Sequence, residues 1–210
     1  MRLLPFDEAH AATVAGWPAS PSEVEMWCAR KEFPLPPGVV TGWQGEPDVR
    51  SHLLFDDLPG DFTHGLPGDL TDGLSRDPSG GLAGVPSGDV SGGLPAAGPI
   101  GYGELWLDIE ENEVELARII VAPGARGRGV GRELVRALTR QAGETGLADV
   151  FMRVHPDNDR ALRCYRGAGF LPVDPALAAT WNLPQPIDYV WLRYAGPADE
   201  HSGGDDRITS

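Results

Sequence analysis

The sequence is poor in cysteine and in long apolar runs, and each shortage excludes a class of protein. The 2 cysteines, Cys28 and Cys164, lie far apart, so they form neither a disulfide framework nor a metal-ligand spacing. No apolar run reaches the roughly 18 residues that a membrane-spanning helix needs. The first residues also lack the apolar core of a signal peptide. We therefore expect a soluble, cytoplasmic protein without a bound metal.

Basic residues are scarce as well, and the formal net charge is -14. This charge argues against a general nucleic-acid binder, because it would repel phosphates. It is compatible with a cationic substrate, and equally with nothing more than solubility. Lys31 is the only lysine among 17 basic residues. The dominance of arginine is typical of a genome-composition bias and says little about site chemistry.

Glycine and proline are abundant, and many of them fall within residues 58–98. This segment has a degenerate eight-residue repeat and too few large apolar side chains to offset the entropy of ordering. We expect it to be a disordered insert in the hairpin between strands at 51–55 and 100–107, since long loops close at a slowly growing cost. Residues 196–210 form a polar, disordered tail in this interpretation, which leaves a single domain over 1–195.

The remaining patterns predict a mixed α/β sheet. Apolar periodicity and turn residues predict helices at 7–17, 20–30, 130–146 and 157–169, and further strands at 1–6, 113–121, 148–156 and 189–194. Strand, helix, strand, helix and strand following an antiparallel hairpin give a sheet of mixed direction with helices packed on it.

The stretch RGRGVG, residues 126–131, lies between a predicted strand and a predicted helix. Backbone N–H groups at a helix start bind anions, and glycine lets the backbone approach a phosphate closely. Arg126 and Arg128 are expected to add positive charge at the mouth of the site. A P-loop is excluded because Arg132 stands where its lysine would be, and a Rossmann fingerprint is excluded because residues 132 and 134 are not small. The alternative is that the glycines only form a tight turn.

Two motifs in this half of the chain resemble those of the GNAT N-acetyltransferase superfamily. VAPGARGRGVGREL contains the pattern Arg/Gln-x-x-Gly-x-Gly/Ala at residues 126–131, and NDRALRCYRGAGF contains the second motif with Asn158, Tyr165 and Phe170. The resemblance covers about 99–173. It implies a mostly antiparallel central sheet that is flanked by helices and splayed where coenzyme A binds.

The resemblance also implies that acetyl-CoA is the cosubstrate and that its acetyl group is transferred directly to an amine. The pyrophosphate would lie on the backbone of residues 126–132 and the pantetheine along 119–121, with the Val121 N–H on the thioester carbonyl. The implied donor-binding residues are Ile119, Ile120, Val121, Arg126, Gly127, Arg128, Gly129, Val130, Gly131, Arg132, Asn158 and Tyr165.

The same resemblance assigns two catalytic residues. Tyr165 would protonate the leaving thiolate, unless it is only a packed tyrosine with a structural hydrogen bond. Glu115 lies eleven residues before Arg126, where family members that use a strand glutamate have their base. Glu104 and a water chain are alternatives for the base, and His155 is more simply a surface histidine.

The acceptor is not identified by the sequence. An acidic cluster over residues 108–115 favours a cationic amine, either a small molecule or a peptide, and the proline-containing segment 179–189 is a candidate for the acceptor mouth. The alternative to an enzyme is a non-catalytic domain that binds coenzyme A or an acyl-CoA. We expect no nucleic-acid or membrane partner, and either a monomer or a homodimer.

Overall fold

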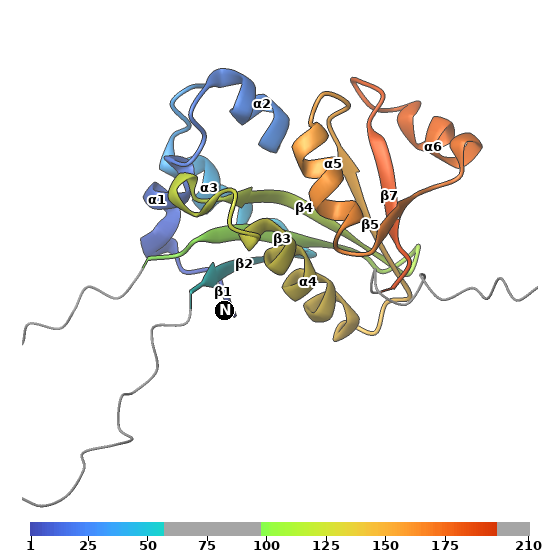
Figure 1. Cartoon of the computed structure of the whole chain (residues 1–210), viewed down its shortest axis with the longest axis horizontal. Helices are drawn as coiled ribbons and strands as arrows, with labels where there is room; N and C mark the ends of the chain where they lie inside the picture. The colour runs from blue at the N-terminus through green and yellow to red at the C-terminus, as the bar shows by residue number, and fades with distance from the viewer. Residues whose placement is uncertain (57–97, 197–210) are drawn as a thin grey trace, which may run out of the picture. The chain divides into compact units, whose positions relative to one another are not determined.

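The computed structural model describes residues 1–56 and 98–196 (Figure 1). The insert expected at 58–98 therefore lies outside the described residues except for Gly98, and the expected tail lies outside them except for Gly196. All described residues belong to one compact unit. No helix among them is long and apolar enough to cross a membrane.

A mixed sheet of seven strands runs through the described part of the chain, as the sequence predicted. The strands are β1 (Arg2–Pro5), β2 (Val49–Phe55), β3 (Gly101–Asp108), β4 (Glu113–Val121), β5 (Asp149–Val154), β6 (Phe170–Pro172) and β7 (Val190–Tyr194). Their order in the sheet is β1-β2-β3-β4-β5-β7-β6. Every neighbouring pair is antiparallel except β4 and β5, which are parallel. The single parallel pair lies in the middle of the sheet, and the site is built there.

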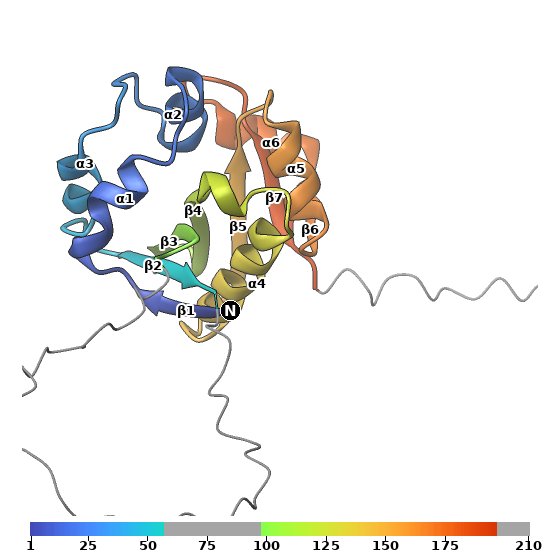
Figure 2. The same cartoon turned by 60° about the vertical axis from the view of Figure 1, so that its left-hand side comes forward.

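Helices cover both faces of this sheet (Figures 1 and 2). They are the short 3₁₀ turns η1 (Glu8–His10) and η2 (Pro123–Ala125), and the α-helices α1 (Ala11–Ala15), α2 (Pro21–Cys28), α3 (Pro37–Trp43), α4 (Val130–Gly143), α5 (Asp159–Arg166) and α6 (Pro175–Asn182). One buried cluster joins α1, α2 and α3 to the sheet through Trp17, Trp43 and Tyr102. The other joins α4 and α5 to the opposite face through Leu105, Leu134 and Leu138. Successive side chains of β3 point to opposite faces of the sheet, so that Tyr102 packs in the first cluster and Leu105 in the second.

The close packing of α4 on β3 requires a residue without a side chain. A Cβ atom at Gly103 would lie 2.6 Å from Leu138 Cδ1, and one at Gly101 would lie 3.0 Å from Leu134 Cδ2. The glycines of β3 therefore let the helix approach the sheet and fix the position of α4, whose first two residues are the last two of RGRGVG.

The structure differs from the sequence prediction at three short elements and one helix. The predicted helix 7–17 is a 3₁₀ turn followed by one and a half turns of helix, because Asp7 caps the first and Gly16 ends the second. Elements α3, β6 and α6 were not predicted. For α6 a signal was present: Asp174 accepts hydrogen bonds from the Ala176 and Leu177 N–H groups, and Pro175 occupies the first helical position.

Replacement of Leu138 by alanine tests the packing of α4 on the sheet. Leu138 is fully buried, so Leu138→Ala should lower the free energy of unfolding by about 2–5 kcal/mol. Leu177→Ala is the matched control, because Leu177 is also helical but 41% exposed, and its effect should stay within about 0.5 kcal/mol. Urea denaturation measures both values, and equal losses would contradict the described core.

Candidate active site

A cavity of about 1220 Å³ opens where β4 and β5 separate. The two strands pair only at Glu113–Asp149, Val114–Val150 and Glu115–Phe151. Beyond Glu115, β4 continues to Val121 without pairing to β5, and the residues of β4 from 115 to 121 line the cavity. The unpaired edge of a strand exposes backbone N–H and C=O groups that an extended ligand can bond. The splayed geometry that the sequence analysis expected is therefore present.

The RGRGVG loop closes one end of the cavity and leads into α4. Gly127 and Gly129 have φ values of +80° and +83°, a left-handed conformation that costs a residue with a side chain. Gly129 is the N-cap of α4, and no side chain caps this end of the helix. Gly131 leaves room for another reason, since a Cβ there would lie 3.2 Å from Cys164 Sγ, which is closer than an ordinary van der Waals contact. The first turn of this 14-residue helix thus lies at the cavity, where Gly131, Arg132 and Glu133 line it, and a helix start of this kind favours an anion.

Arg126, the first residue of the motif, does not add a free charge at the mouth as expected. Its Nη1 lies 3.0 Å from Glu23 Oε1, its Nη2 donates to the Trp17 carbonyl at 3.1 Å, and its Nε donates to the Val121 carbonyl at 3.0 Å. Burial by itself would raise the pKa of Glu23. The hydrogen bond from the Ala19 N–H and the contact with Arg126 outweigh this effect, so the pKa of Glu23 lies below its usual value. Arg126 therefore ties α2 to the end of β4.

Positive charge in the cavity comes instead from other arginines. Arg128 of the loop and Arg132 and Arg136 of α4 line it, as do Arg160 and Arg163 of α5. Arg160 and Arg163 were not predicted as part of the site, although their i, i+3 spacing places them at neighbouring positions of one helix. The cavity is thus rich in arginine within a chain of net charge -14.

The second motif forms α5, on the other side of the cavity from β4. The Asn158 Oδ1 atom accepts a hydrogen bond from the Ala161 N–H at 3.1 Å and so caps this helix. Asn158 and Tyr165 both line the cavity. Burial, followed by the neighbouring Cys164, raises the pKa of the Tyr165 hydroxyl. Tyr165 therefore keeps its proton at neutral pH, and its hydroxyl is a weaker acid than that of an exposed tyrosine.

Glu115 lies at the point where the strands part, and it lines the cavity. Its Oε1 lies 3.0 Å from Nε of Arg153 on β5, and the two side chains form an ion pair. Burial raises its pKa to about 7, against the opposing effect of Arg153. A carboxyl group with this pKa is partly ionised at neutral pH, which suits a residue that gains and loses a proton.

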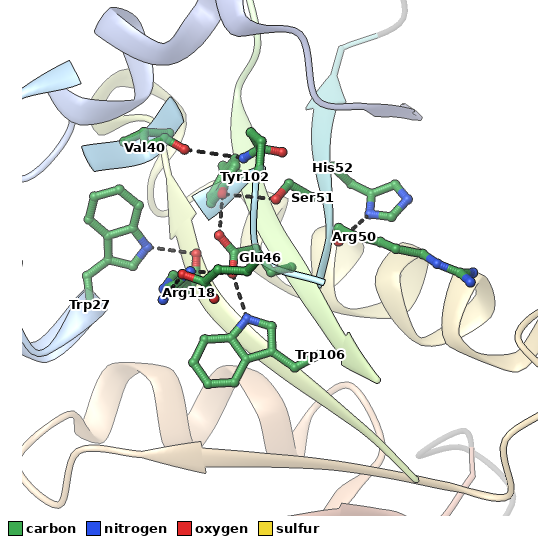
Figure 3. Close-up of polar contacts among 11 residues, drawn as sticks. Trp27, Val40, Glu46, Arg50, Ser51, His52, Tyr102, Trp106 and Arg118 are labelled. Carbon is green, nitrogen blue, oxygen red and sulfur yellow. Dashed lines mark hydrogen bonds and ion pairs between the residues drawn. The ribbon is translucent and has the colours of Figure 1, made fainter. Parts of the chain in front are cut away.

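Glu104, the alternative base, is fully buried and its oxygens are occupied. Figure 3 labels its three partners, Tyr102, Trp106 and Arg118. It accepts hydrogen bonds from the Tyr102 hydroxyl and, at 2.6 Å, from Trp106 Nε1, and it pairs with Arg118 Nη1 at 3.0 Å. Burial raises the pKa of Glu104, and Arg118, Tyr102 and Trp106 lower it in part. Glu104 is not among the residues that line the cavity.

Arg118 occupies a bulge in β4. The register with β3 shifts between Tyr102 and Glu104, and Arg118 has a φ of +46°. Its guanidinium lies over the rings of Trp43 and Trp106, at 4.3 and 4.8 Å from their centroids. Its carbonyl accepts a hydrogen bond from Trp27 Nε1 of α2 at 2.7 Å. An inserted residue bends the strand beside the cavity. The contacts of Arg118 fix both its side chain and its carbonyl group.

The remaining candidates fall in different places. His155 lines the cavity at the end of β5, and its Nδ1 accepts a hydrogen bond from the Asp157 N–H at 3.2 Å. Of the acidic cluster, only Glu115 lines the cavity, whereas Asp108, Glu110 and Glu111 lie at the exposed hairpin between β3 and β4. No group of three His, Cys, Asp or Glu side chains within residues 1–56 and 98–196 is placed to hold a metal ion.

The wall opposite α2 comes from the segment between α6 and β7, part of the expected acceptor mouth. Gln185, Pro186 and Tyr189 line the cavity there. Asn182 closes this loop, since its Nδ2 donates to the Tyr189 carbonyl at 3.0 Å and its Oδ1 accepts from the Tyr189 N–H at 3.2 Å.

Arg153 of β5 was not predicted as a site residue, because a single arginine in an apolar strand gives no sign of its partner in the sequence.

Comparison with known families and curated proteins identifies related sequences. A family model described as "Acetyltransferase (GNAT) family" matches residues 50–170. The mycothiol acetyltransferase of Frankia casuarinae is 39% identical over 64 residues, 30% of this chain and 19% of that protein. The N-alpha-acetyltransferase RimI of Mycobacterium tuberculosis is 45% identical over 58 residues, 28% of this chain and 35% of that protein. The chain thus spans only about a fifth to a third of these curated relatives.

Solved structures resemble the fold over more of the chain. AAC(6')-Ib in complex with ribostamycin and coenzyme A superposes with a TM-score of 0.59 at 17% identity, over 97% of both chains. The spermidine N-acetyltransferase of Vibrio cholerae in complex with CoA and spermine gives a TM-score of 0.54 at 14% identity, over 82% of both chains. At this level of identity the likeness shows a shared fold.

Replacement of Glu104 by glutamine tests the buried network below the cavity. Glu104→Gln should lower the free energy of unfolding by about 3 kcal/mol, because it leaves the guanidinium of Arg118 without its buried partner. Glu32→Gln is the control: the Arg30–Glu32 pair is half exposed on both sides, and such pairs contribute at most about 1 kcal/mol. Denaturant titration compares the two, and a Glu104 effect no larger than that of Glu32 would contradict the network.

Proposed function

Because the chain belongs to the acetyltransferase (GNAT) family, we propose that it transfers the acetyl group of acetyl-CoA directly to a primary amine. The observation that carries this proposal is the cavity itself. It joins an arginine-rich helix start, an unpaired strand edge, a protonated tyrosine and a glutamate with a pKa of about 7. A domain that only binds coenzyme A has no need of the last two.

The donor would be held by the backbone of the loop and by the edge of β4. Gly127 and Gly129 let the backbone approach a pyrophosphate, and Arg128, Arg132 and the arginines of α5 supply charge. The pantetheine would extend along Ile119, Ile120 and Val121. Coenzyme A is bound in related folds solved with it, which supports the fit.

The Val121 N–H is the proposed donor to the thioester carbonyl. The Ala122 N–H donates to the Ile100 carbonyl on the side of β3. Successive N–H groups of a strand point to opposite sides, so the Val121 N–H points towards the cavity. A fixed donor of this kind stabilises the negative charge that develops on the oxygen during acyl transfer.

Glu115 and Tyr165 would move the protons. Glu115 takes one proton from the ammonium group of the acceptor, and the neutral nitrogen attacks the thioester carbonyl carbon. The new N–C bond forms, the C–S bond breaks, and the nitrogen gives its second proton to water. Tyr165 protonates the leaving sulfur and regains a proton from solvent, while Glu115 releases its proton, so the reaction yields an amide, free CoA and one proton.

The proposal for the acceptor is limited to a primary amine, which carries one positive charge before Glu115 deprotonates it. Near Glu115 the charges of the cavity wall are paired, since Arg153 contacts Glu115 and Arg118 contacts Glu104 and Glu46. The acidic residues of the β3–β4 hairpin lie outside the cavity. Other acidic side chains, among them Glu25 and Asp159, do line the cavity, and they are compatible with an acceptor that carries further positive charge.

Ligand-induced stabilisation and thiol release test the donor proposal. Acetyl-CoA at a hundredfold over its Kd should add about 2.7 kcal/mol to the stability of the wild type. Gly129→Ala should weaken acetyl-CoA binding at least about tenfold, or 1.4 kcal/mol, because a Cβ enters the anion cradle. Gly146→Ala is the matched control, since Gly146 has the same left-handed φ (+80°) but lies outside the cavity.

Thiol release across a panel of primary amines completes this experiment. Release that depends on the amine supports the enzyme, whereas binding of acetyl-CoA without release under any amine would favour the non-catalytic alternative. A larger stabilisation by ATP than by acetyl-CoA, or equal losses in Gly129→Ala and Gly146→Ala, would contradict the donor site.

The pH dependence of kcat/KM tests the role of Glu115. The base must be ionised, so the rate should fall about tenfold per pH unit below the Glu115 pKa of about 7 and level off above it. Glu115→Gln should remove this limb and lower the rate by about 10²-fold or more. Glu113→Gln is the control on the same strand, outside the cavity; it should keep the rate above the limb and the limb itself, moved somewhat to lower pH because the Glu113 charge raises the Glu115 pKa.

A further inference from the structure

Arg153 of β5 is held from several sides at the point where the strands part. Its Nε lies 3.0 Å from Glu115 Oε1, and its Nη1 donates to Gln185 Oε1 at 3.0 Å. Its guanidinium carbon lies 5.5, 5.6 and 5.7 Å from the ring centroids of Trp106, Tyr189 and Trp191. Three aromatic rings at this distance each favour a cation, and together they leave it little freedom.

The side chains that enclose Arg153 are themselves fixed. Asn182 Oδ1 accepts hydrogen bonds from Trp191 Nε1 at 2.9 Å and from the Tyr189 N–H at 3.2 Å. The same residue, at the end of α6, donates to the Tyr189 carbonyl. The loop from 183 to 189 is thereby tied closed, with Gln185 turned to Arg153.

We propose that Arg153 is a positioning residue, which fixes the place and charge of the Glu115 carboxylate and is in turn placed by Gln185 and the rings around it. The inference rests on the proposed function in one respect only, the use of Glu115 as the base. It extends that function to β5 and to the α6–β7 segment, which lie outside both sequence motifs.

The charges that face Glu115 support this assignment. Burial raises the Glu115 pKa most, and Arg153 is the largest opposing influence; Glu113 raises the pKa and Arg118 lowers it by less. Arg118 is already paired with Glu104 and Glu46, whereas the carboxylate that Arg153 pairs with is Glu115. Without Arg153 the Glu115 carboxylate would be buried without its nearest cation, and its ionised form would become less stable.

An arginine that served only to hold the fold would have no need to face a ligand cavity. Arg153 and Glu115 instead both line the cavity, with side chains 25% and 20% exposed. An acceptor amine that approaches Glu115 therefore meets an ion pair of fixed geometry. Fixed placement of a reacting carboxylate contributes to the rate, because it holds the base in the geometry that proton transfer needs.

Direct titration of Glu115 tests the inference without any need for catalysis. The side-chain carboxyl carbons of ¹³C-labelled glutamate are followed by NMR as the pH is varied, and the signal lost in Glu115→Gln identifies Glu115. In Arg153→Gln the Glu115 pKa should rise by at least about one unit, as expected when an opposite charge at contact distance is removed. Arg153→Lys keeps a cation there and should restore most of the wild-type titration.

Arg193→Gln is the matched control. Arg193 lies on β7, pairs with Asp149 through its Nε at 3.1 Å, and has its guanidinium carbon 5.8 Å from the Phe151 ring, but it is outside the cavity. The Glu115 titration should not change in this variant. An unchanged titration in Arg153→Gln, or an equal shift in Arg193→Gln, would overturn the proposal.

The pH–rate profile separates this inference from the proposed function. If Arg153→Gln moves the acid limb of kcat/KM by the same amount as it moves the Glu115 pKa measured by NMR, both the inference about Arg153 and the role of Glu115 as base hold. If the NMR titration moves while the wild-type profile has no limb near the Glu115 pKa, the role of Glu115 as base fails and the placement of its charge by Arg153 stands.

Discussion

The early end of the pairing between β4 and β5 is the constraint on which the site depends. Three residue pairs, the last at Glu115, hold the only parallel strands of the described sheet together. Beyond them the edge of β4 is free for a ligand, and the cavity is the space that this separation creates. The fold must therefore hold β4 in place from β3 and from the helices, because β5 no longer supports it.

Two contacts from α2 provide that support at separate points of β4. Glu23 binds the guanidinium of Arg126, which follows the strand, and Trp27 donates to the carbonyl of Arg118 at the bulge. Arg118 is anchored from the other side by Glu104, so the bulge is held between a helix and the core. The first arginine of the loop motif is thus bound to α2 by an ion pair while it also lines the cavity beside the glycines of the helix start.

The sequence predicted α4, α5, the glycine-rich helix start and the strands other than β6, because each of these is encoded locally, in periodicity and in turn residues. It also placed Glu115 and Tyr165 in a common site by resemblance, and both line the cavity. It did not reveal that Arg126 is paired with Glu23, a contact between residues 103 positions apart. Arg153 was missed for the same reason, since its partners come from three segments that only the folded sheet brings together. The acidic hairpin, conversely, is conspicuous in the sequence but lies away from the cavity.

Glu104, which is fully buried, and Glu115, which is 20% exposed, show how the same residue type comes to different uses on neighbouring strands. Glu104 accepts bonds from a tyrosine, a tryptophan and an arginine, and it faces the core, so its protonation cannot change without breaking a network. Glu115 has one arginine partner and a cavity beside it. Burial raises the pKa of both carboxyl groups, but only Glu115 combines a pKa of about 7 with access to a ligand. The number of fixed donors around each carboxylate, rather than its burial, supports the assignment of Glu115 as the base and of Glu104 as a structural anchor.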